Sequence, residues 1–144
     1  AEWEYAARGG IEGARYPWGD DLMPGGEHRC NIWHGSFPDH DDAADGFAGT
    51  APATAYASNG FGLHQTVGNV WAWCSDWFDP AWASCGHASL DPVGPPAGSE
   101  RVMRGGSHLC HDSYCNRYRV SARTGTAPDS ATSHIGFRTV AATR

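Results

Sequence analysis

The hydrophobic residues of this chain fall into short islands separated by turn signals, and only a few segments repeat with a helical or strand period. Residues 1–10 place good helix formers before Gly9 and Gly10, which predicts the last turns of a helix that stops at the glycines. Residues 11–60 carry brief apolar islands between turn residues. We therefore expect loops with short strand or turn segments there, and no helix.

Four later segments have the composition of strands. Residues 67–74 alternate as a half-buried strand does, with Trp71 and Trp73 on one face as candidate core residues. Residues 101–107 predict a strand that runs into a tight turn, and residues 118–123 and 135–140 predict two more strands. Residues 79–100 hold four of the nine prolines and predict a long surface loop. The pattern as a whole predicts an α+β fold, rich in loops and with little regular secondary structure.

The length of 144 residues allows one domain with a modest core, and we take residues 1–144 as part of a single domain. No apolar run approaches the roughly 18 residues that span a membrane. All ten basic residues are Arg, which argues against a nucleic-acid or membrane surface built from Lys clusters. The chain opens inside a structural element without Met, so we expect further sequence upstream of Ala1.

Charge is distributed unevenly within a formal net charge of −6. Residues 1–50 hold ten of the sixteen acidic residues, whereas six arginines lie between positions 101 and 138. The first half is therefore suited to a hard cation and the second half to an anion or a peptide backbone. In the acidic stretch from Asp39 to Asp45, the carboxylates and nearby carbonyls are the oxygen ligands that Ca²⁺ prefers, although a solvated acidic loop explains them equally well.

Five cysteines at irregular spacing do not form a simple disulfide framework, and a reducing compartment fits an odd number better. Cys110 and Cys115 are separated by four residues just after a Gly-Gly-Ser turn. Such a pair can form a disulfide, pack as two buried thiols, or act in redox or metal chemistry, where two thiolates alone suit Cu(I). Zinc is disfavoured because no second cysteine pair is present, although His108 or His111 could complete a mixed site.

Several blocks of the sequence resemble the formylglycine-generating enzymes of the sulfatase-modifying factor family, whose domain has a fold related to C-type lectins. The residues from Cys110 to Arg119 match every fixed position of the signature Cys-His-x-Ser-Tyr-Cys-x-Arg-Tyr-Arg. The resemblance covers nearly the whole chain, which is similar to the C-terminal part of that domain. The matching blocks are residues 1–10, 16–20, 59–63, 67–71, 104–107, 110–119 and 135–138.

The resemblance implies a copper-dependent oxidase that converts a cysteine in a Cys-x-Pro-x-Arg segment of sulfatases to Cα-formylglycine with O2. Cys110 and Cys115 would be the catalytic residues and would bind Cu(I). Trp71 and Ser107 would line the pocket for substrate and O2, with Tyr114 and Arg117 near the bound peptide. The implied partner is an unfolded or nascent sulfatase peptide, and we expect a cytoplasmic bacterial enzyme, monomeric and dependent on the upstream half of its domain.

The resemblance also implies Ca²⁺ as a second cofactor. A first calcium site would use the side chains of Asn31 and Asp45 and the carbonyls of Ile32 and Phe47. A second, weaker site would fall at Gln65, Gly68 and Val70, but its usual carboxylate is replaced by Ala72. We therefore expect this second site to bind calcium weakly or not at all.

Two departures from the family pattern accompany these matches: His108 replaces the usual aromatic residue, and Cys30, Cys74 and Cys85 are not the cysteines that form disulfides in secreted members. Two alternative functions remain. One is a noncatalytic ligand-binding module on the same scaffold, which the intact cysteine block disfavours. The other is a non-haem iron sulfoxide synthase, which would need a His-rich helical domain that this sequence does not contain.

Overall fold

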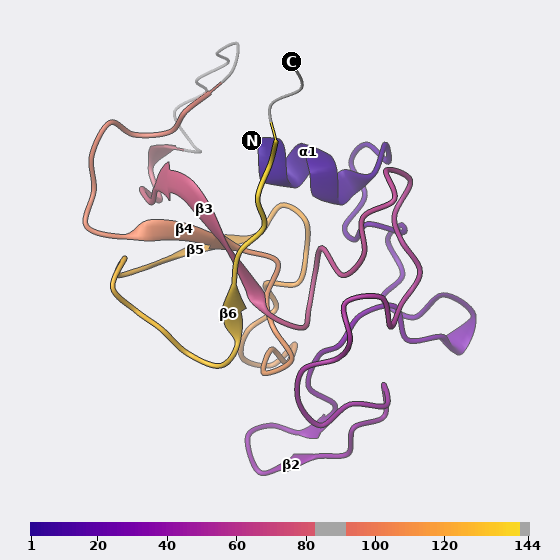
Figure 1. Ribbon diagram of the computed structural model, residues 1–144. Helices are drawn as coiled ribbons and strands as arrows, with labels where there is room; N and C mark the ends of the chain where they lie inside the picture. The colour runs from indigo at the N-terminus through magenta and orange to yellow at the C-terminus, as the bar shows by residue number, and fades with distance from the viewer. Residues whose placement is uncertain (83–91, 142–144) are drawn as a thin grey trace.

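A small twisted sheet forms one side of the molecule and long loops form the other (Figure 1). The computed structural model describes residues 1–82 and 92–141. The four-stranded sheet has the order β5-β4-β3-β6. Strands β3, β4 and β5 are antiparallel neighbours, whereas β6 pairs with β3 in parallel. The strands are β3 (Trp71–Trp77), β4 (Arg101–Arg104), β5 (Arg123–Thr126) and β6 (Ile135–Gly136).

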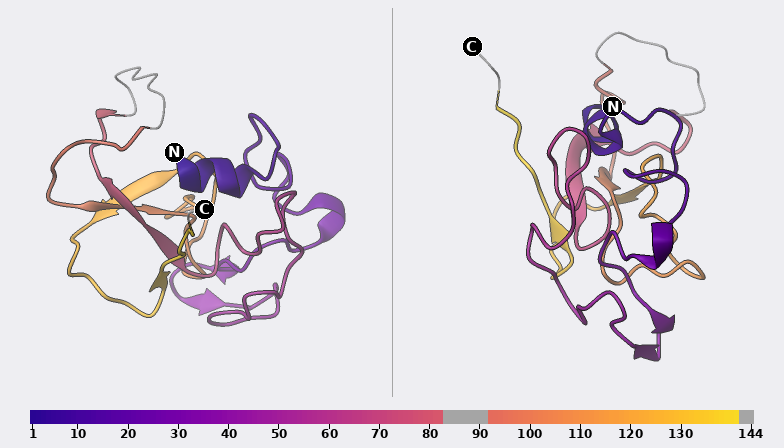
Figure 2. Two further views of the ribbon diagram at one scale, coloured as in Figure 1. Left: turned by 45° about the horizontal axis from the view of Figure 1, so that its top comes forward. Right: turned by 90° about the vertical axis from the view of Figure 1, so that its right-hand side faces the viewer.

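The loop side consists mainly of residues 9–70 and contains only short regular elements. A two-stranded ribbon pairs β1 (Gly35–Ser36) with β2 (His40–Asp41), and η1 (Pro24–Gly26) is a single 3₁₀ turn. Figure 2 shows these loops beside the sheet from two further directions. The predicted loop-rich α+β class is therefore confirmed, although the expectation of no helix between residues 11 and 60 missed the turn η1.

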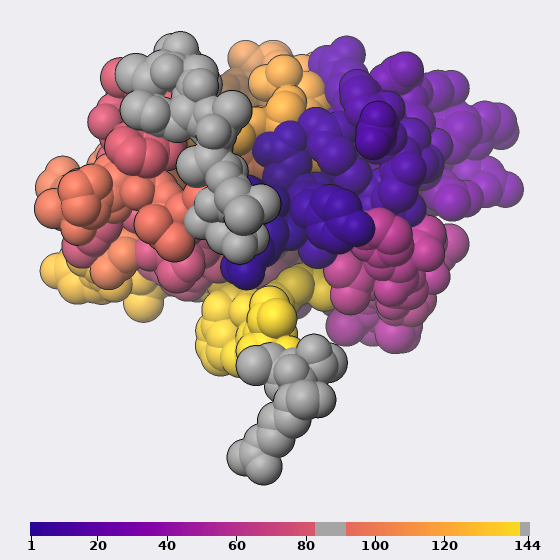
Figure 3. Space-filling model, turned by 90° about the horizontal axis from the view of Figure 1, so that it is seen from above, coloured from indigo at the N-terminus to yellow at the C-terminus, as the bar shows by residue number. Residues whose placement is uncertain are grey.

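Helix α1 (Glu2–Arg8) ends at Gly9, as its sequence predicts. Gly9 adopts φ 57°, and a Cβ there would lie 2.7 Å from the side chain of Asn59. Asn59 Nδ2 donates hydrogen bonds to the carbonyls of Ala6 and Ala7 at 2.8 and 3.2 Å. The helix end is therefore satisfied by a residue 50 positions away, and α1 lies at the surface beside the segment around residue 60 (Figure 3).

The strands begin and end differently from the sequence pattern. Gly68 and Asn69 have positive φ angles of 73° and 61°, so residues 67–70 cannot extend β3, which runs instead to Trp77. The strand predicted at 118–123 is wrong. Tyr118 and Val120 alternate because both side chains enter the core, while the strand that pairs with β4 starts only at Arg123. The strand predicted at 135–140 is confined to β6.

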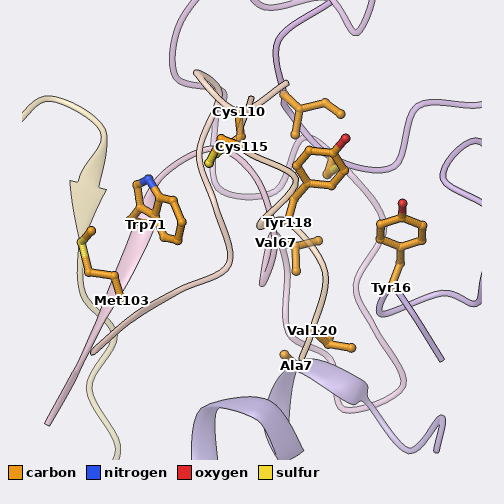
Figure 4. Close-up of a cluster of buried hydrophobic side chains, with 11 residues drawn as sticks. Ala7, Tyr16, Val67, Trp71, Met103, Cys110, Cys115, Tyr118 and Val120 are labelled. Carbon is orange, nitrogen blue, oxygen red and sulfur yellow. The ribbon is translucent and has the colours of Figure 1, made fainter. Parts of the chain in front are cut away.

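The core lies between α1, the sheet and the loops (Figure 4). Tyr118, Val120 and Val67 are its largest fully buried apolar side chains. Trp71 is buried there and Trp73 packs against the same cluster, which confirms the prediction that the two tryptophans belong to the core. No helix within the described ranges combines the length and apolar character needed to cross a membrane.

One buried cation links the helix to the sheet. Arg104 is 4% exposed, and its Nη2 donates to Glu4 Oε2 and to the Val120 carbonyl, both at 2.6 Å. Its guanidinium also lies 4.9 Å from the Trp3 ring centroid. Burial raises the pKa of Glu4, but hydrogen bonds from Arg8 and Arg104 outweigh burial and hold that pKa below its usual value. This ion pair therefore fixes α1 against β4.

Replacing Glu4 with Gln is expected to lower the free energy of unfolding by about 3 kcal/mol, because the buried guanidinium of Arg104 loses its counter-charge. Urea denaturation measures the change, with Glu2→Gln on the exposed side of α1 as the control. The contribution of Glu4 should be complete above its unfolded pKa and should disappear as the pH falls through its lowered folded pKa. Equal losses in the two variants would contradict this account.

Candidate active site

A double-glycine turn carries the chain from β4 into the loop that holds the two candidate reactive cysteines. Gly105 and Gly106 have φ angles of 88° and 71°. A Cβ on Gly105 would lie 2.7 Å from the Thr66 carbonyl oxygen, and one on Gly106 would lie 3.0 Å from the Tyr118 nitrogen. Only glycine accommodates both the backbone angles and these close approaches. The turn therefore brings the residues after β4 back against the core.

The loop after this turn is held by its own backbone. Cys110 N donates to the Ser107 carbonyl at 2.9 Å, and Cys115 N donates to the His111 carbonyl at 2.7 Å. The Cys110 carbonyl accepts a hydrogen bond from Trp33 N at 3.1 Å. These bonds close two consecutive turns, which bring together side chains five residues apart.

The two thiols meet in the core. Cys110 is 2% exposed and Cys115 is 6% exposed, and their Sγ atoms are 2.6 Å apart. Both cysteines are free, so the disulfide alternative does not describe this structure. The pair behaves as a single proton-sharing unit in which either sulfur can donate to the other. Figure 4 shows them in the same buried cluster as Trp71.

The surroundings make the two sulfurs unequal. The hydrogen bond with Cys115, together with burial, raises the pKa of Cys110 well above its usual range. The hydrogen bond from Cys110 lowers the pKa of Cys115 to about 6, and Arg117 lowers it further against the opposing effect of burial. Arg117 Nη1 lies 3.9 Å from Cys115 Sγ. The raised pKa of Cys110 and the lowered pKa of Cys115 together favour a pair that holds one proton and one negative charge.

The predicted pocket residues divide into two groups. Trp71, Ser107 and Arg117 lie with the thiols: Trp71 and Ser107 are buried, and the Ser107 N–H points toward Cys110 Sγ at 3.4 Å. Tyr114, in contrast, is 72% exposed and stacks on Phe37, with ring centroids 5.0 Å apart. Tyr114 therefore belongs to the outer face of the loop rather than to the pocket.

Sequence reasoning missed the aromatic partners of that outer face. Phe37 stacks on the His111 ring at 6.2 Å as well as on Tyr114, and Trp33 meets Phe37 edge to face at 5.4 Å. Both residues lie in the stretch 11–60, which the hydrophobic pattern assigned to loops with short strand or turn segments. No local signal identifies Phe37, because its partners His111 and Tyr114 are about 75 residues further along the chain.

The residues predicted for the first calcium site lie together and suit a hard cation. Asn31 is fully buried, and its Oδ1 has no hydrogen-bond partner. The Asp45 side chain is 0% exposed, and its two oxygens accept hydrogen bonds from the amides of Ile32 and Phe47 at 2.9 and 3.0 Å. A buried carboxylate without an arginine partner and an unpaired amide oxygen are the donors that Ca²⁺ would satisfy.

The rest of the acidic stretch does not join this site. Asp41 Oδ1 accepts from the amides of His34 and Ala43, and Asp42 Oδ1 accepts from that of Ala44, so both carboxylates cap local turns. Across the described residues, no group of three or more His, Cys, Asp or Glu could hold a metal ion. A calcium site here would therefore depend on Asn31 and backbone carbonyls in addition to Asp45.

The second predicted calcium site lines a cavity of about 300 Å³. Gln65, Val70 and Ala72 contribute to its wall, whereas Gly68 does not, and none of the described lining residues carries a carboxylate. The charged lining residue is Arg138, whose Nη2 donates to the carbonyls of His64 and Gln65 at 2.6 and 2.9 Å. A guanidinium at this wall disfavours a second cation.

The remaining cysteines and histidines lie apart from the thiol pair. Cys30 is free and buried, and burial beside Asp45 raises its pKa to about 12. Cys74 is free and half-buried, while Cys85 lies outside the described residues. His111 faces Ser113 at 2.7 Å, and His108 faces the Asn69 carbonyl at 2.9 Å. Neither ring has a hydrogen bond to a sulfur among the described contacts.

The charge on Cys115 can be tested by titration of the reduced protein. Thiolate absorbance should rise with an apparent pKa near 6, and Arg117→Met should move that pKa upward because the nearby positive charge is lost. Arg119→Met is the matched control, since Arg119 donates to the Asn116 carbonyl instead of a sulfur. If the two variants titrated alike, Arg117 would have no part in stabilising the thiolate.

Comparison with known proteins identifies the family. The formylglycine-generating enzyme of Thermomonospora curvata is 57% identical over 143 residues, which cover 98% of this chain and 47% of that protein. A Mus musculus protein named inactive C-alpha-formylglycine-generating enzyme 2 is 40% identical over 140 residues, or 95% of this chain and 40% of that protein. The chain therefore spans less than half the length of these relatives.

The fold agrees with the sequence comparison. The structure of Treponema denticola variable protein 1 matches with a TM-score of 0.67 and 28% identity, over 94% of this chain and 43% of that chain. The family model described as sulfatase-modifying factor enzyme 1-like domain matches residues 1–143. The expected fold is thus confirmed, and the chain belongs to the sulfatase-modifying factor enzyme 1-like family.

Proposed function

We propose that this protein takes part in sulfatase maturation as a copper-dependent oxidoreductase that converts a cysteine in a Cys-x-Pro-x-Arg segment to Cα-formylglycine with O2. The observation that supports this proposal best is the buried, free and proton-sharing pair Cys110 and Cys115. Redox-inactive thiols of the core need no charge, whereas the hydrogen bond from Cys110 and the nearby Arg117 both lower the pKa of Cys115 and favour its thiolate.

The two sulfurs suit Cu(I) in their chemistry. Thiolates are soft ligands, and a site with two sulfurs and no third acidic or imidazole ligand fits an ion that accepts low coordination. When bound, Cu(I) would supply the reactivity toward O2 and a soft position for the substrate thiol. The shared proton would leave the pair when Cu(I) is held by both thiolates, so the net charge would stay at −1, and Arg117 would lie beside that charge.

The remaining residues would prepare the pocket and present the peptide. Trp71 would exclude water from the space beside the thiols, and the buried Ser107 would hold its backbone N–H toward Cys110. Phe37 and Tyr114 offer an exposed aromatic surface next to the loop that carries both cysteines. We propose that the unfolded sulfatase segment lies along this surface, with its reactive cysteine directed at the thiol pair.

The chain spans 47% of the Thermomonospora curvata relative. We therefore propose that peptide oxidation also requires the part of the domain that this relative has and this chain does not supply. Metal binding by the thiol pair does not need that part, because the contacts that position both sulfurs lie within residues 33–117. The copper site can thus be tested on this chain directly.

Anaerobic titration of the reduced protein with Cu(I) against a competing chelator is expected to show one tightly bound equivalent. Cys110→Ala and Cys115→Ala should each lower the affinity by several orders of magnitude, because one sulfur alone cannot satisfy the ion. Cys30→Ala is the matched control, since Cys30 is also a buried free thiol. Tight binding that survives in both test variants, or no tight binding by the folded wild type, would refute the proposed site.

The second candidate function is a noncatalytic module on the same scaffold, and the 40% identical relative named as inactive is the observation that favours it. With the rest of the domain supplied, a Cys-x-Pro-x-Arg peptide should gain an aldehyde in the presence of copper and O2, and both cysteine variants should abolish the product. A copper-loaded wild type that yields no aldehyde would support the noncatalytic function.

We also propose one calcium ion at Asn31, Ile32, Asp45 and Phe47. Calcium at a hundredfold excess over its Kd should stabilise the fold by about 2.7 kcal/mol, which raises the Tm by roughly 5–10 °C. Asp45→Ala should remove this shift, whereas Asp39→Asn in the same acidic stretch should retain it.

Ala72→Glu should add a second equivalent of bound calcium at the weak second site. Two equivalents bound by the wild type would contradict the weak second site.

A further inference from the structure

Two histidines outside the thiol pair face each other across the start of β3. The ring centroids of His108 and His134 are 6.4 Å apart, and the ring planes are nearly perpendicular at 89°. His108 belongs to the loop after β4, and His134 immediately precedes β6. Both side chains are partly exposed, so an ion from solvent can reach them.

The backbones of both residues are tied to the same short segment. His108 N donates to the Asn69 carbonyl at 2.9 Å, and Trp71 N donates to the His134 carbonyl at 2.8 Å. Asn69 is itself fixed, because its side chain exchanges hydrogen bonds with the backbone of Ala51 at 2.8 and 3.1 Å. The backbone positions of the two histidines are therefore set by a common frame rather than by two independent loops.

The hydrogen bond of the His108 ring prepares its other nitrogen for coordination. Nδ1 lies 2.9 Å from the Asn69 carbonyl oxygen, and a carbonyl can only accept, so Nδ1 carries the hydrogen. In the neutral ring the lone pair is then on Nε2. A metal-bound histidine usually has this arrangement, with its second ring nitrogen donating to a carbonyl or carboxylate.

His134 complements this ring. Among the described contacts, neither of its ring nitrogens forms a hydrogen bond, and its ring contact is with His108. Burial and the nearby His108 both lower the pKa of His134. The imidazole is therefore neutral at pH 7, which is the form that binds metal ions.

From this geometry we propose that His108 and His134 bind one transition-metal ion of the class that prefers imidazole, such as Zn²⁺, at a site separate from Cys110 and Cys115. An imidazole nitrogen lies about 2.0–2.1 Å from zinc, so the centroids of two rings on one tetrahedral ion are roughly 5 Å apart. The observed 6.4 Å is longer, so the rings must turn toward each other when both bind the ion. Water fills the other positions of the ion, which makes the site an open one of moderate affinity.

The site differs from the thiol pair in ligand type and does not depend on the proposed function. Imidazole selects borderline ions such as zinc, whereas thiolates select softer ones. An ion at the histidines would also join the loop after β4 to the start of β6, which is a two-residue strand at the edge of the sheet. Zinc binding should therefore raise the Tm in addition to giving a stoichiometric titration.

The test is a Zn²⁺ titration of the Cys110→Ser/Cys115→Ser variant, in which the thiol pair cannot contribute. One equivalent is expected, with an accompanying rise in Tm. His108→Phe and His134→Asn should each weaken binding at least tenfold, whereas His111→Asn should not change it. His111 is the matched control because it lies in the same loop and faces Ser113 instead of His134.

Binding that survives in both His108→Phe and His134→Asn would overturn the proposal. His28 and His34 also form a close pair of rings, at 4.6 Å, so zinc binding that is lost only in His28→Asn would overturn it as well. If the double cysteine variant does not fold, Co²⁺ replaces Zn²⁺ as the probe in the wild type. Thiolate ligation then gives an intense sulfur-to-cobalt absorption band, and imidazole ligation does not. A histidine-dependent ion without that band supports the site, and a band lost only with the cysteines refutes it.

Discussion

The arrangement of the candidate active site depends on the close approach of the Gly105–Gly106 backbone to two other segments. A single added Cβ would collide with the Thr66 carbonyl or the Tyr118 amide. The same turn places Arg104 on the side of α1 and Ser107 on the side of the thiols. A constraint of this kind acts through excluded volume, so it positions the loop without a strong bond of its own.

Buried negative charge is stabilised differently in the loop half and in the sheet half of the molecule. In the loop half, the buried Asp45 carboxylate accepts hydrogen bonds from two backbone amides and lies 3.5 Å from His34 Nε2, beside an Asn31 oxygen that has no partner. In the sheet half, Arg117 approaches Cys115 and lowers its pKa. A buried carboxylate whose basic neighbour is a histidine, which is charged only when protonated, favours a bound cation. A thiolate with a nearby guanidinium already has a permanent positive charge beside it.

A protein named formylglycine-generating enzyme and one named as inactive match this chain at 57% and 40% identity. The core that supports the loop, from Val67 to Tyr118, is a packing requirement and does not by itself imply chemistry. The two sulfurs of Cys110 and Cys115, in contrast, are not explained by packing. Two free thiols that share a proton in a nearly solvent-free core gain little for stability, which is why the functional proposal rests on them.

Local patterns in the sequence determined the stop of α1 at Gly9, the loop-rich class, the separation of acidic from basic residues, and the adjacency of Cys110 and Cys115. Each of these depends on near neighbours or on composition. Tertiary contacts decided the rest. Residues 118–120 are core rather than strand because the antiparallel partner of Arg104 is Arg123. The Tyr114 side chain points outward because its ring stacks on Phe37. The His108 ring is hydrogen-bonded to the Asn69 carbonyl and lies against the His134 ring. These pairings join residues 19 to 77 positions apart, and no local preference of the chain can specify which distant side chain will be there.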